Sequence, residues 1–535
     1  MKKVKQVMAL TLAAIMAMSL AACGGSSSSS STTTTTAAAG GSTETTAAAA
    51  ETTKAPIVVN VNEAESTLTS LDFYHTTIHS ENQYAEMVYD PLIEGDYDGN
   101  FKPCLAESWT LSDDGLEAEL KLVQGVKFHD GTDFNADDVM ATLGWIAEDV
   151  NNVPLITSKW LNLKSVEKVD DYTVKIYFNY PLHTFEQALS GTFIFSNEDW
   201  EKYGEDMWNQ KVINGTGPYK FVEWVDGQYT EYAINEDYWQ GRHSNIDTVK
   251  IWYITEANTI VSSLLSGDID TCAAINTDLV PMLSSDDNIS VDLALIDNLN
   301  YIQFHCAPGA AFEDINMRKA VMHGFDCQNI LNLYDGGQIL GAACTVGDIG
   351  CVDDLEHYAY DPELAKQYLE EAGYDGSTIT LYSTKAYTNE MTSIAGDLAK
   401  IGMNIEIKPV DSAEFASIRT NGEYDMFYGF NAVVYSDLMA VLVDRVERDI
   451  HSHGFVDEEI NAWIEEANGI SDPEVRAPIM QKVYRKMYDL YGPICGTVQK
   501  SRYSATRKGL EGITKTKGGK FYFRNMYVDE EVWGK

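Results

Sequence analysis

Three motifs in close succession decide the fold: Leu105-Ala106-Glu107-Ser108-Trp109, Gly125-Val126-Lys127-Phe128-His129-Asp130-Gly131 and Ala136-Asp137-Asp138-Val139. Within them, His129, Asp130 and Asp137 have the side chains of catalytic groups. However, Asp-Gly is typical of a turn, and Asp137 follows Asn135, the predicted N-cap of a helix. We therefore interpret these residues as structural.

Apolar runs and helix-start signals alternate on both sides of this stretch. The predicted strands cover residues 57–61, 121–128, 173–178, 249–254, 379–382, 405–410 and 424–428. The predicted helices begin after Asn135, at Asn258, after Asp361-Pro362, at Ser412 and after Asp472-Pro473, and a further one ends at Ile401-Gly402. Strands that alternate with helices indicate an α/β fold with a parallel sheet covered on both faces. The best architecture is two α/β lobes, the first of which carries an extra antiparallel, β-rich portion.

The N-terminal residues predict export and a lipid anchor. A basic start precedes an apolar run at 7–20, which suits a signal peptide and is shorter than the roughly twenty residues of a membrane span. The run ends in Leu20-Ala21-Ala22-Cys23, so residues 1–22 read as a lipoprotein signal peptide and Cys23 as the lipidated residue. An ordinary secretory signal that contains a cysteine is the alternative. Residues 24–55 are almost all Gly, Ser, Thr and Ala, a composition typical of a disordered tether.

Charge and cysteine spacing exclude some classes of function. The formal net charge is -43, and so acidic a surface repels nucleic acid. None of the cysteines after Cys23 forms a Cys-x-x-Cys pair, which argues against a zinc or thioredoxin-type site. An exported chain can oxidise its thiols, and Cys344 with Cys351 would close a short loop. The sequence leaves the pairing open.

Several segments, in order, resemble the peptide/nickel-type extracellular solute-binding proteins of ABC transporters, solute-binding family 5. The resemblance begins with the motifs quoted above and extends over nearly everything after residue 56. The further segments that carry it are Gly215-Thr216-Gly217-Pro218-Tyr219 and residues 235–239, 264–270, 312–318, 360–373, 399–403 and 423–430.

This resemblance implies a two-lobed, periplasmic-binding-protein-like fold with an extra β-rich subdomain, three lobes in total. Lobe I would span 56–297, with the extra subdomain at about 86–214, lobe II would span 298–500, and residues 501–535 would return to lobe I. A monomer of this kind captures a small solute between its lobes and hands it to the permease subunits of an ABC importer. The lipid at Cys23 would hold it on the outer face of the cytoplasmic membrane, which is the cell surface in a Gram-positive cell and the periplasmic side otherwise.

By the resemblance, a first ligand-binding region is the loop after Asp72, with Tyr74, His75, Thr76 and Thr77. Its hydroxyls and rings suit hydrogen bonds to a ligand, although a plain surface loop is the alternative interpretation. If the chain from His75 to His79 were helical, the two imidazoles could share a face and chelate a metal. We expect polar loop histidines instead, with no metal and no cofactor.

A second predicted region is the end of the strand at 424–428, with Gly429, Phe430 and Asn431. Peptide-binding relatives typically have Gly-Trp there, followed shortly by an aspartate that holds the α-amino group of the peptide. In this chain Phe430 replaces the tryptophan, and the nearest carboxylate is Asp437. Because a desolvated ammonium needs a paired carboxylate, this departure weakens the case for peptides specifically.

Lys385 and Tyr387 complete the predicted site, since in some relatives a cationic side chain near here meets a ligand carboxylate. A solvated surface lysine is the alternative interpretation of Lys385. Among ligand classes we rank peptides first, then oligosaccharides or other organic solutes, then metal chelates. A surface receptor for a signal peptide would use the same fold. The sequence lacks the motifs of phosphate-binding loops, zinc proteases and α/β-hydrolases, so an enzyme such as a secreted hydrolase ranks lower.

Overall fold

The computed structural model describes most of the chain after the predicted tether. The described residues are 55–64, 67–75, 79–96, 100–148, 163–182, 184–334, 336–432, 438–442, 454–515 and 521–533. The predicted signal peptide, Cys23 and nearly all of the tether lie outside these ranges. No helix within them is both long enough and apolar enough to cross a membrane.

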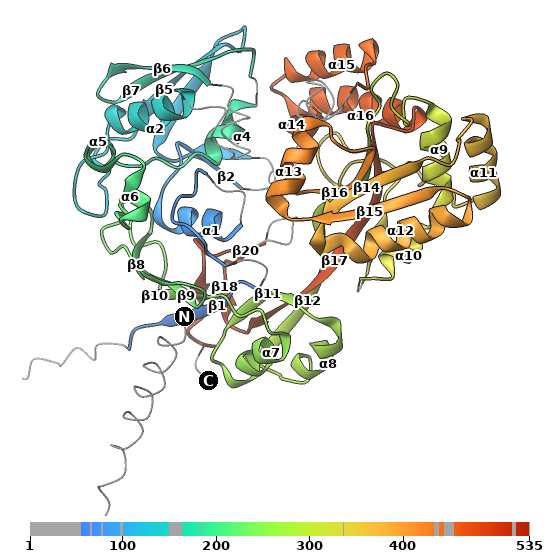
Figure 1. Ribbon diagram of the computed structural model, residues 1–535. Coiled ribbons are helices and arrows are strands. Elements are labelled where there is room, and N and C mark those ends of the chain that lie inside the picture. The colour runs from blue at the N-terminus through green and yellow to red at the C-terminus, as the bar shows by residue number, and fades with distance from the viewer. Residues whose placement is uncertain are drawn as a thin grey trace, which may run out of the picture. The chain divides into compact units, whose positions relative to one another are not determined.

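A mixed sheet of eleven strands runs through the described chain (Figure 1). Its order is β15-β14-β16-β12-β17-β11-β1-β10-β9-β8, and β13 also pairs with β17. The bounds are β1 Val58–Asn62, β8 Tyr219–Val225, β9 Tyr229–Ile234, β10 Thr248–Trp252, β11 Thr271–Ile275, β12 Ile289–Phe304, β13 Gly337–Ile339, β14 Thr378–Thr384, β15 Asn404–Val410, β16 Met426–Ala432 and β17 Ile494–Arg507.

Two long strands, β12 and β17, connect the two ends of this sheet (Figure 1). They pair with each other in an antiparallel register, from Ile289 opposite Arg507 to Gln303 opposite Ile494. The register shifts around Leu299, so the pairing changes midway along both strands. Hydrophobic cores form separately on either side: one uses residues 57–273 and 510–528, and others use residues 299–498. We call these two parts the first and the second lobe.

The first lobe confirms the predicted antiparallel, β-rich portion. A four-stranded antiparallel sheet, in the order β4-β5-β7-β6, packs against helix α2 (Ala136–Glu148), whose N-cap residue is the predicted Asn135. Its strands are β4 Ala106–Leu111, β5 Glu117–Leu122, β6 Leu163–Asp170 and β7 Thr173–Phe178. The strand predicted over 121–128 is wrong beyond Leu122, because Gly125 adopts a φ of 81° and turns the chain. The lobe's other helices and short strands are α1 His79–Val88, β2 Ile93–Gly95, β3 Phe101–Pro103, α4 Phe185–Ser190, α5 Asn197–Tyr203, α6 Asp206–Asn209, β18 Leu510–Glu511, β19 Thr514–Lys515, β20 Phe521–Tyr522 and β21 Tyr527–Val528, with α7 Ala257–Ser266, η1 Thr277–Leu279 and α8 Val280–Leu283 beside β11.

In the second lobe, the predicted parallel sheet is confirmed for β15, β14 and β16, which run parallel to one another. It is wrong for the sheet as a whole, since β16 pairs antiparallel with β12. The carboxylates of Asp361 and Asp472 cap the helices that their Asp-Pro motifs predict. The helices are α9 Ile315–Gly324, α10 Cys327–Leu331, α11 Pro362–Glu371, η2 Lys385–Tyr387, α12 Thr388–Lys400, α13 Ser412–Asn421, α14 Met439–Leu442, α15 Glu458–Asn468 and α16 Pro473–Asp489.

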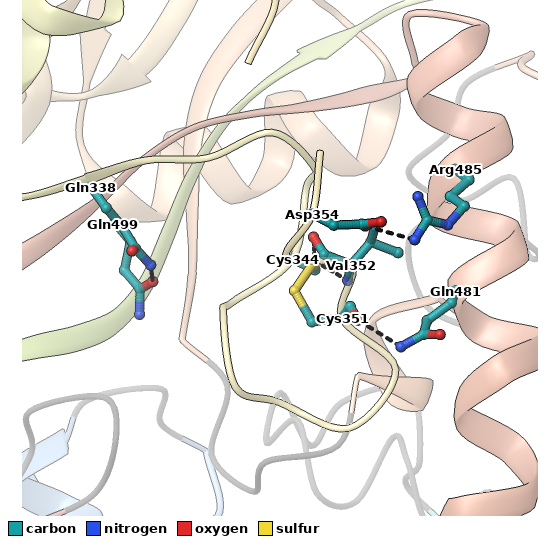
Figure 2. The surroundings of a disulfide bond; sticks show 8 residues. All are labelled: Gln338, Cys344, Cys351, Val352, Asp354, Gln481, Arg485 and Gln499. Carbon is teal, nitrogen blue, oxygen red and sulfur yellow. Dashed lines mark hydrogen bonds and ion pairs between the residues drawn. A yellow bond between two sulfur atoms is a disulfide. The ribbon is translucent and has the colours of Figure 1, made fainter. Parts of the chain in front are cut away.

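A disulfide bond between Cys344 and Cys351 closes a short loop in the second lobe, as Figure 2 shows. Gln481 of α16 donates a hydrogen bond to the carbonyl of Cys351, at 3.0 Å. The carbonyl of Ile349, inside the loop, accepts a hydrogen bond from the backbone of Leu438. The loop therefore joins α16 to the start of α14. The five other described cysteines are buried thiols.

Candidate ligand-binding site

The end of β16 presents an aromatic side chain to solvent. Phe430 is 41 % exposed, a large fraction for a phenylalanine. The preceding Gly429 pairs with Tyr301 of β12, and a Cβ atom there would lie 2.8 Å from the Phe427 ring and 2.9 Å from the Tyr301 ring. A larger residue here would require these rings to shift, so glycine allows β16 to pack closely against them.

Tyr387 of η2 lies beside Phe430. The two ring centroids are 5.5 Å apart, and Tyr387 also contacts Tyr428 edge-on at 5.6 Å. Tyr387 is mostly buried, so Phe430 forms the exposed edge of this aromatic group. Neighbouring Lys385 instead points its ammonium at Asp411, where the Nζ–Oδ1 distance is 2.8 Å and both side chains are exposed.

A buried lysine that the sequence analysis did not single out lies behind these rings. Lys500 of β17 is 8 % exposed, and its Nζ is 4.0 Å from the ring centroid of Tyr334 and 4.6 Å from that of Tyr387. Oε1 of Glu390, on α12, is 3.8 Å from the same Nζ. Burial raises the pKa of the Glu390 carboxyl, against the lowering effect of Lys500.

The position of Lys500 is set by strand pairing. Gly337 of β13 lies opposite Lys500, and the side chain of Gln338 donates a 2.6 Å hydrogen bond to that of Gln499 (Figure 2). On the other side of β17, the β12 register shifts between Leu295 and Leu299. The signal in the sequence that could have identified Lys500 was a polar Gln-Lys pair directly after the apolar residues of a buried strand.

The first predicted region lies in an aromatic cluster of the first lobe. Tyr74 is 2 % exposed, its hydroxyl donates to the carbonyl of Phe193, and its ring meets Trp145 edge-on at 5.2 Å. Burial raises the Tyr74 pKa well above its ordinary value. His75 is more accessible, and its Nδ1 is 2.7 Å from Oδ2 of Asp72. Of this pair, His75 has the side chain that a ligand can reach.

The suspected catalytic side chains of the quoted motifs all make local contacts. Nε2 of His129 lies 2.9 Å from the carbonyl oxygen of Gly217, and burial lowers the His129 pKa to about 4. Asp130 accepts hydrogen bonds from Thr132 within its turn. Asp137 pairs with Lys168. Among the described residues, no group of three or more histidine, cysteine or acidic side chains is placed to hold a metal ion.

The structure thus brings Tyr387, Gly429 and Phe430 together and adds Lys500 to them. Lys385 lies in the same turn but pairs with Asp411. The described contacts of Tyr74 and His75 are within the first lobe. Thr76, Thr77 and Asp437 lie outside the described residues, as does the side chain of Asn431, whose backbone pairs with Leu299. The ligand-binding role of these residues stays a prediction.

A small pocket elsewhere in the second lobe lies apart from these residues. Its lining residues are Gly341, Ala342, Ala343, Tyr358, Tyr484, Met487, Tyr488, Ile494, Cys495 and Gly496. None of them belongs to the predicted site, and it has little room beyond a water molecule. We therefore centre the candidate site on Phe430.

Comparisons with known proteins place the chain among binding proteins. Residues 100–444 match the model of the bacterial extracellular solute-binding proteins, family 5 middle region. The glutathione-binding protein GsiB of Salmonella typhi is 29% identical over 359 residues, 66% of this chain and 69% of that protein. The heme-binding protein A of Haemophilus influenzae is 29% identical over 441 residues, 75% and 80% of the two chains. The structure of HbpA2 from Haemophilus parasuis superposes with a TM-score of 0.74 at 25% identity, covering 88% of this chain and 100% of that one.

Proposed function

The chain belongs to the bacterial extracellular solute-binding proteins of family 5, and on this premise we propose that it captures a di- or oligopeptide for an ABC importer. The family confirms the resemblance found in the sequence, and the likeness to HbpA2 confirms the two-lobed α/β fold. Its relatives are solute-binding proteins and not enzymes. The peptide ligand, the importer and the lipid anchor are parts of our proposal.

The observation that carries this proposal is the exposed Phe430 ring beside Tyr387, at the end of β16. An exposed aromatic side chain on a rigid strand is a ready contact surface for apolar ligand groups. Gly429, in the same strand, packs closely against the ring of Tyr301.

The relatives favour an organic ligand with carboxylate groups. GsiB is named for glutathione, which is a tripeptide, and heme-binding protein A for heme. Both molecules combine carboxylates with a larger organic body. Peptides therefore rank first for this chain, and heme-like compounds, oligosaccharides and metal chelates follow.

We further propose that ligand binding closes the two lobes about β12 and β17. Closure would bend the chain near the boundaries at 297/298 and 500/501. The register shift around Leu299 supports this placement, because pairing that is already irregular there costs less to deform. A ligand that contacts both lobes would shift the ensemble toward the closed form. Identical small-angle scattering with and without a tightly bound ligand would contradict closure.

The test of the ligand class is a thermal-shift screen of the purified protein. Di- to pentapeptides, glutathione, hemin, oligosaccharides and nickel chelates are the probes. A ligand at about 100 times its dissociation constant adds roughly 2.7 kcal/mol of stability, which a melting curve shows clearly. Shifts with peptides support the proposal. A thermal shift with sugars or chelates alone would show that the ligand belongs to a class other than peptides.

The lipid anchor is tested separately, in a cell. Replacing Cys23 by serine removes the thiol that the lipid would modify. We expect the variant to leave the membrane fraction for the medium or periplasm, while the unchanged protein stays bound. Equal membrane retention of both would show that Cys23 does not anchor the chain.

A further inference from the structure

We propose that Lys500 recognises a carboxylate of the ligand, with Phe430 and Tyr387 holding the apolar part beside that carboxylate. This inference rests on the proposed function and deepens it, since it names the ligand chemistry of the same site. The sequence analysis assigned a cationic role only to Lys385, whose ammonium pairs with Asp411 on the surface.

The environment of the Lys500 ammonium suits an incoming anion. Lys500 is held between the rings of Tyr334 and Tyr387, with Nζ at 4.0 and 4.6 Å from their centroids. Aromatic faces stabilise a cation and exclude water from it. Because the surroundings screen charge less than bulk water does, an anion that arrives here is attracted more strongly than at an exposed lysine.

Lys500 pairs with Glu390 over a long distance. An Nζ–Oε1 distance of 3.8 Å is long for an ion pair, and burial raises the pKa of Glu390. Burying two charges costs free energy that such a distance recovers only partly. A ligand carboxylate that approaches Nζ directly would form a closer pair than Glu390 does. Glu390 and the ligand carboxylate would then compete for Lys500.

Lys500 adjoins the exposed aromatic side chain of the site. The Phe430 ring contacts Tyr387 at 5.5 Å, and Lys500 lies over Tyr387, so the exposed ring and the ammonium both contact the same tyrosine. Lys500 also lies next to the shifted register of β12 and β17. A ligand bound there would contact the strands that join the two lobes.

The experiment compares each peptide of the screen as free acid and as C-terminal amide, and 3-phenylpropionate with 3-phenylpropanamide. Affinities are measured by calorimetry for peptides and by ligand-observed NMR for the small pair. A charge-assisted contact predicts that each acid binds about tenfold more tightly than its amide. Lys500→Gln should remove this preference, and Lys500→Arg should keep most of it.

Glu390→Gln separates recognition from a structural ion pair. If Glu390 competes with the ligand carboxylate, this variant binds the acids about threefold more tightly and the amides unchanged. A purely structural pair would give no gain. Lys366→Gln on α11, whose exposed lysine pairs with Glu363, is the matched control for loss of one positive charge. Melting curves confirm that each variant is folded.

The outcomes separate this inference from the proposed function. Peptides that bind equally as acid and amide would overturn the role of Lys500 and leave peptide capture intact. If no peptide binds but 3-phenylpropionate does, in a Lys500-dependent manner, peptide capture fails and carboxylate recognition stands. If no carboxylate probe binds better than its amide, carboxylate recognition is wrong.

Discussion

Each lobe contains a buried ion pair. The differences between the two pairs lead us to assign a structural role to one and a role in ligand recognition to the other. In the first lobe, Asp90 and Arg524 are 0 % and 4 % exposed and in direct contact. Asp90 also accepts hydrogen bonds from Thr216, Tyr238 and Trp239. In the second lobe, Lys500 and Glu390 are 3.8 Å apart and lie behind an exposed aromatic ring. A pair enclosed by hydrogen bonds stabilises the fold, whereas the longer pair is the one to which we assign a role in ligand recognition.

The electrostatics follow the same division. Burial by itself raises the pKa of Asp90, but Arg524 and the hydrogen bonds outweigh it and lower that pKa below its ordinary value. For Glu390 the effect of burial prevails and the pKa is raised. The surroundings of Asp90 therefore favour ionisation of its carboxyl, whereas the surroundings of Glu390 disfavour it. Four predictions test this contrast.

The largest effect is expected from Arg524→Met. It leaves the Asp90 carboxylate buried without its charge partner, together with the carbonyls of Glu86 and Tyr89 that Arg524 now contacts. We expect the free energy of unfolding to fall by about 3–5 kcal/mol, measured by urea unfolding with tryptophan fluorescence. If Arg524→Met lowered the free energy of unfolding by less than Lys500→Met does, the comparison of the two ion pairs would be reversed.

A second effect of similar size comes from His129, another group buried in the first lobe. Its folded pKa is about 4, below the unfolded value, so its contribution to stability is complete above about pH 6.5 and is lost as the pH falls through 4. Between pH 7 and 4, the free energy of unfolding of the unchanged protein should fall by about 3 kcal/mol more than that of the His129→Gln variant. Parallel stability profiles for the two proteins would contradict this.

The third effect concerns the disulfide of the second lobe. Replacing Cys344 and Cys351 by alanine releases a short loop and should lower the free energy of unfolding by about 2.5 kcal/mol. The measurement is urea unfolding with and without dithiothreitol. The variant should be insensitive to the reductant, whereas the unchanged protein should approach the variant once reduced. If the variant also responded to dithiothreitol, the effect of the reductant would come from another part of the protein.

The smallest expected effect is the coupling energy between Glu390 and Lys500, and it tests the comparison of the two ion pairs most directly. In a double-mutant cycle of Glu390→Gln and Lys500→Gln, we expect a coupling energy of about 1 kcal/mol or less, because the two charges are far apart for an ion pair. A coupling as large as the cost of Arg524→Met would show that the Lys500 pair is also structural.

Local signals in the sequence predicted part of the secondary structure. Asn135, Asp361 and Asp472 cap helices where their motifs indicate, because a cap depends on hydrogen bonds to backbone groups two or three residues away. The strand predicted over 121–128 was too long, since apolar residues continue past the turn at Gly125. In the candidate site, an end-of-strand signal and the family resemblance pointed to Phe430 and Tyr387, and neither pointed to Lys500 or Glu390.

The sequence by itself determined the family, the α/β class and several of the helices and strands, since these follow from patterns within short stretches of chain. Only the tertiary structure decided which charges meet. Asp90 and Arg524 are 434 residues apart in the chain, and Lys500 reaches Glu390 only through the pairing of β17 with its neighbours. One residue of register shift would turn Lys500 to the other face of the sheet. Such contacts depend on how strands align in space, which no local pattern encodes.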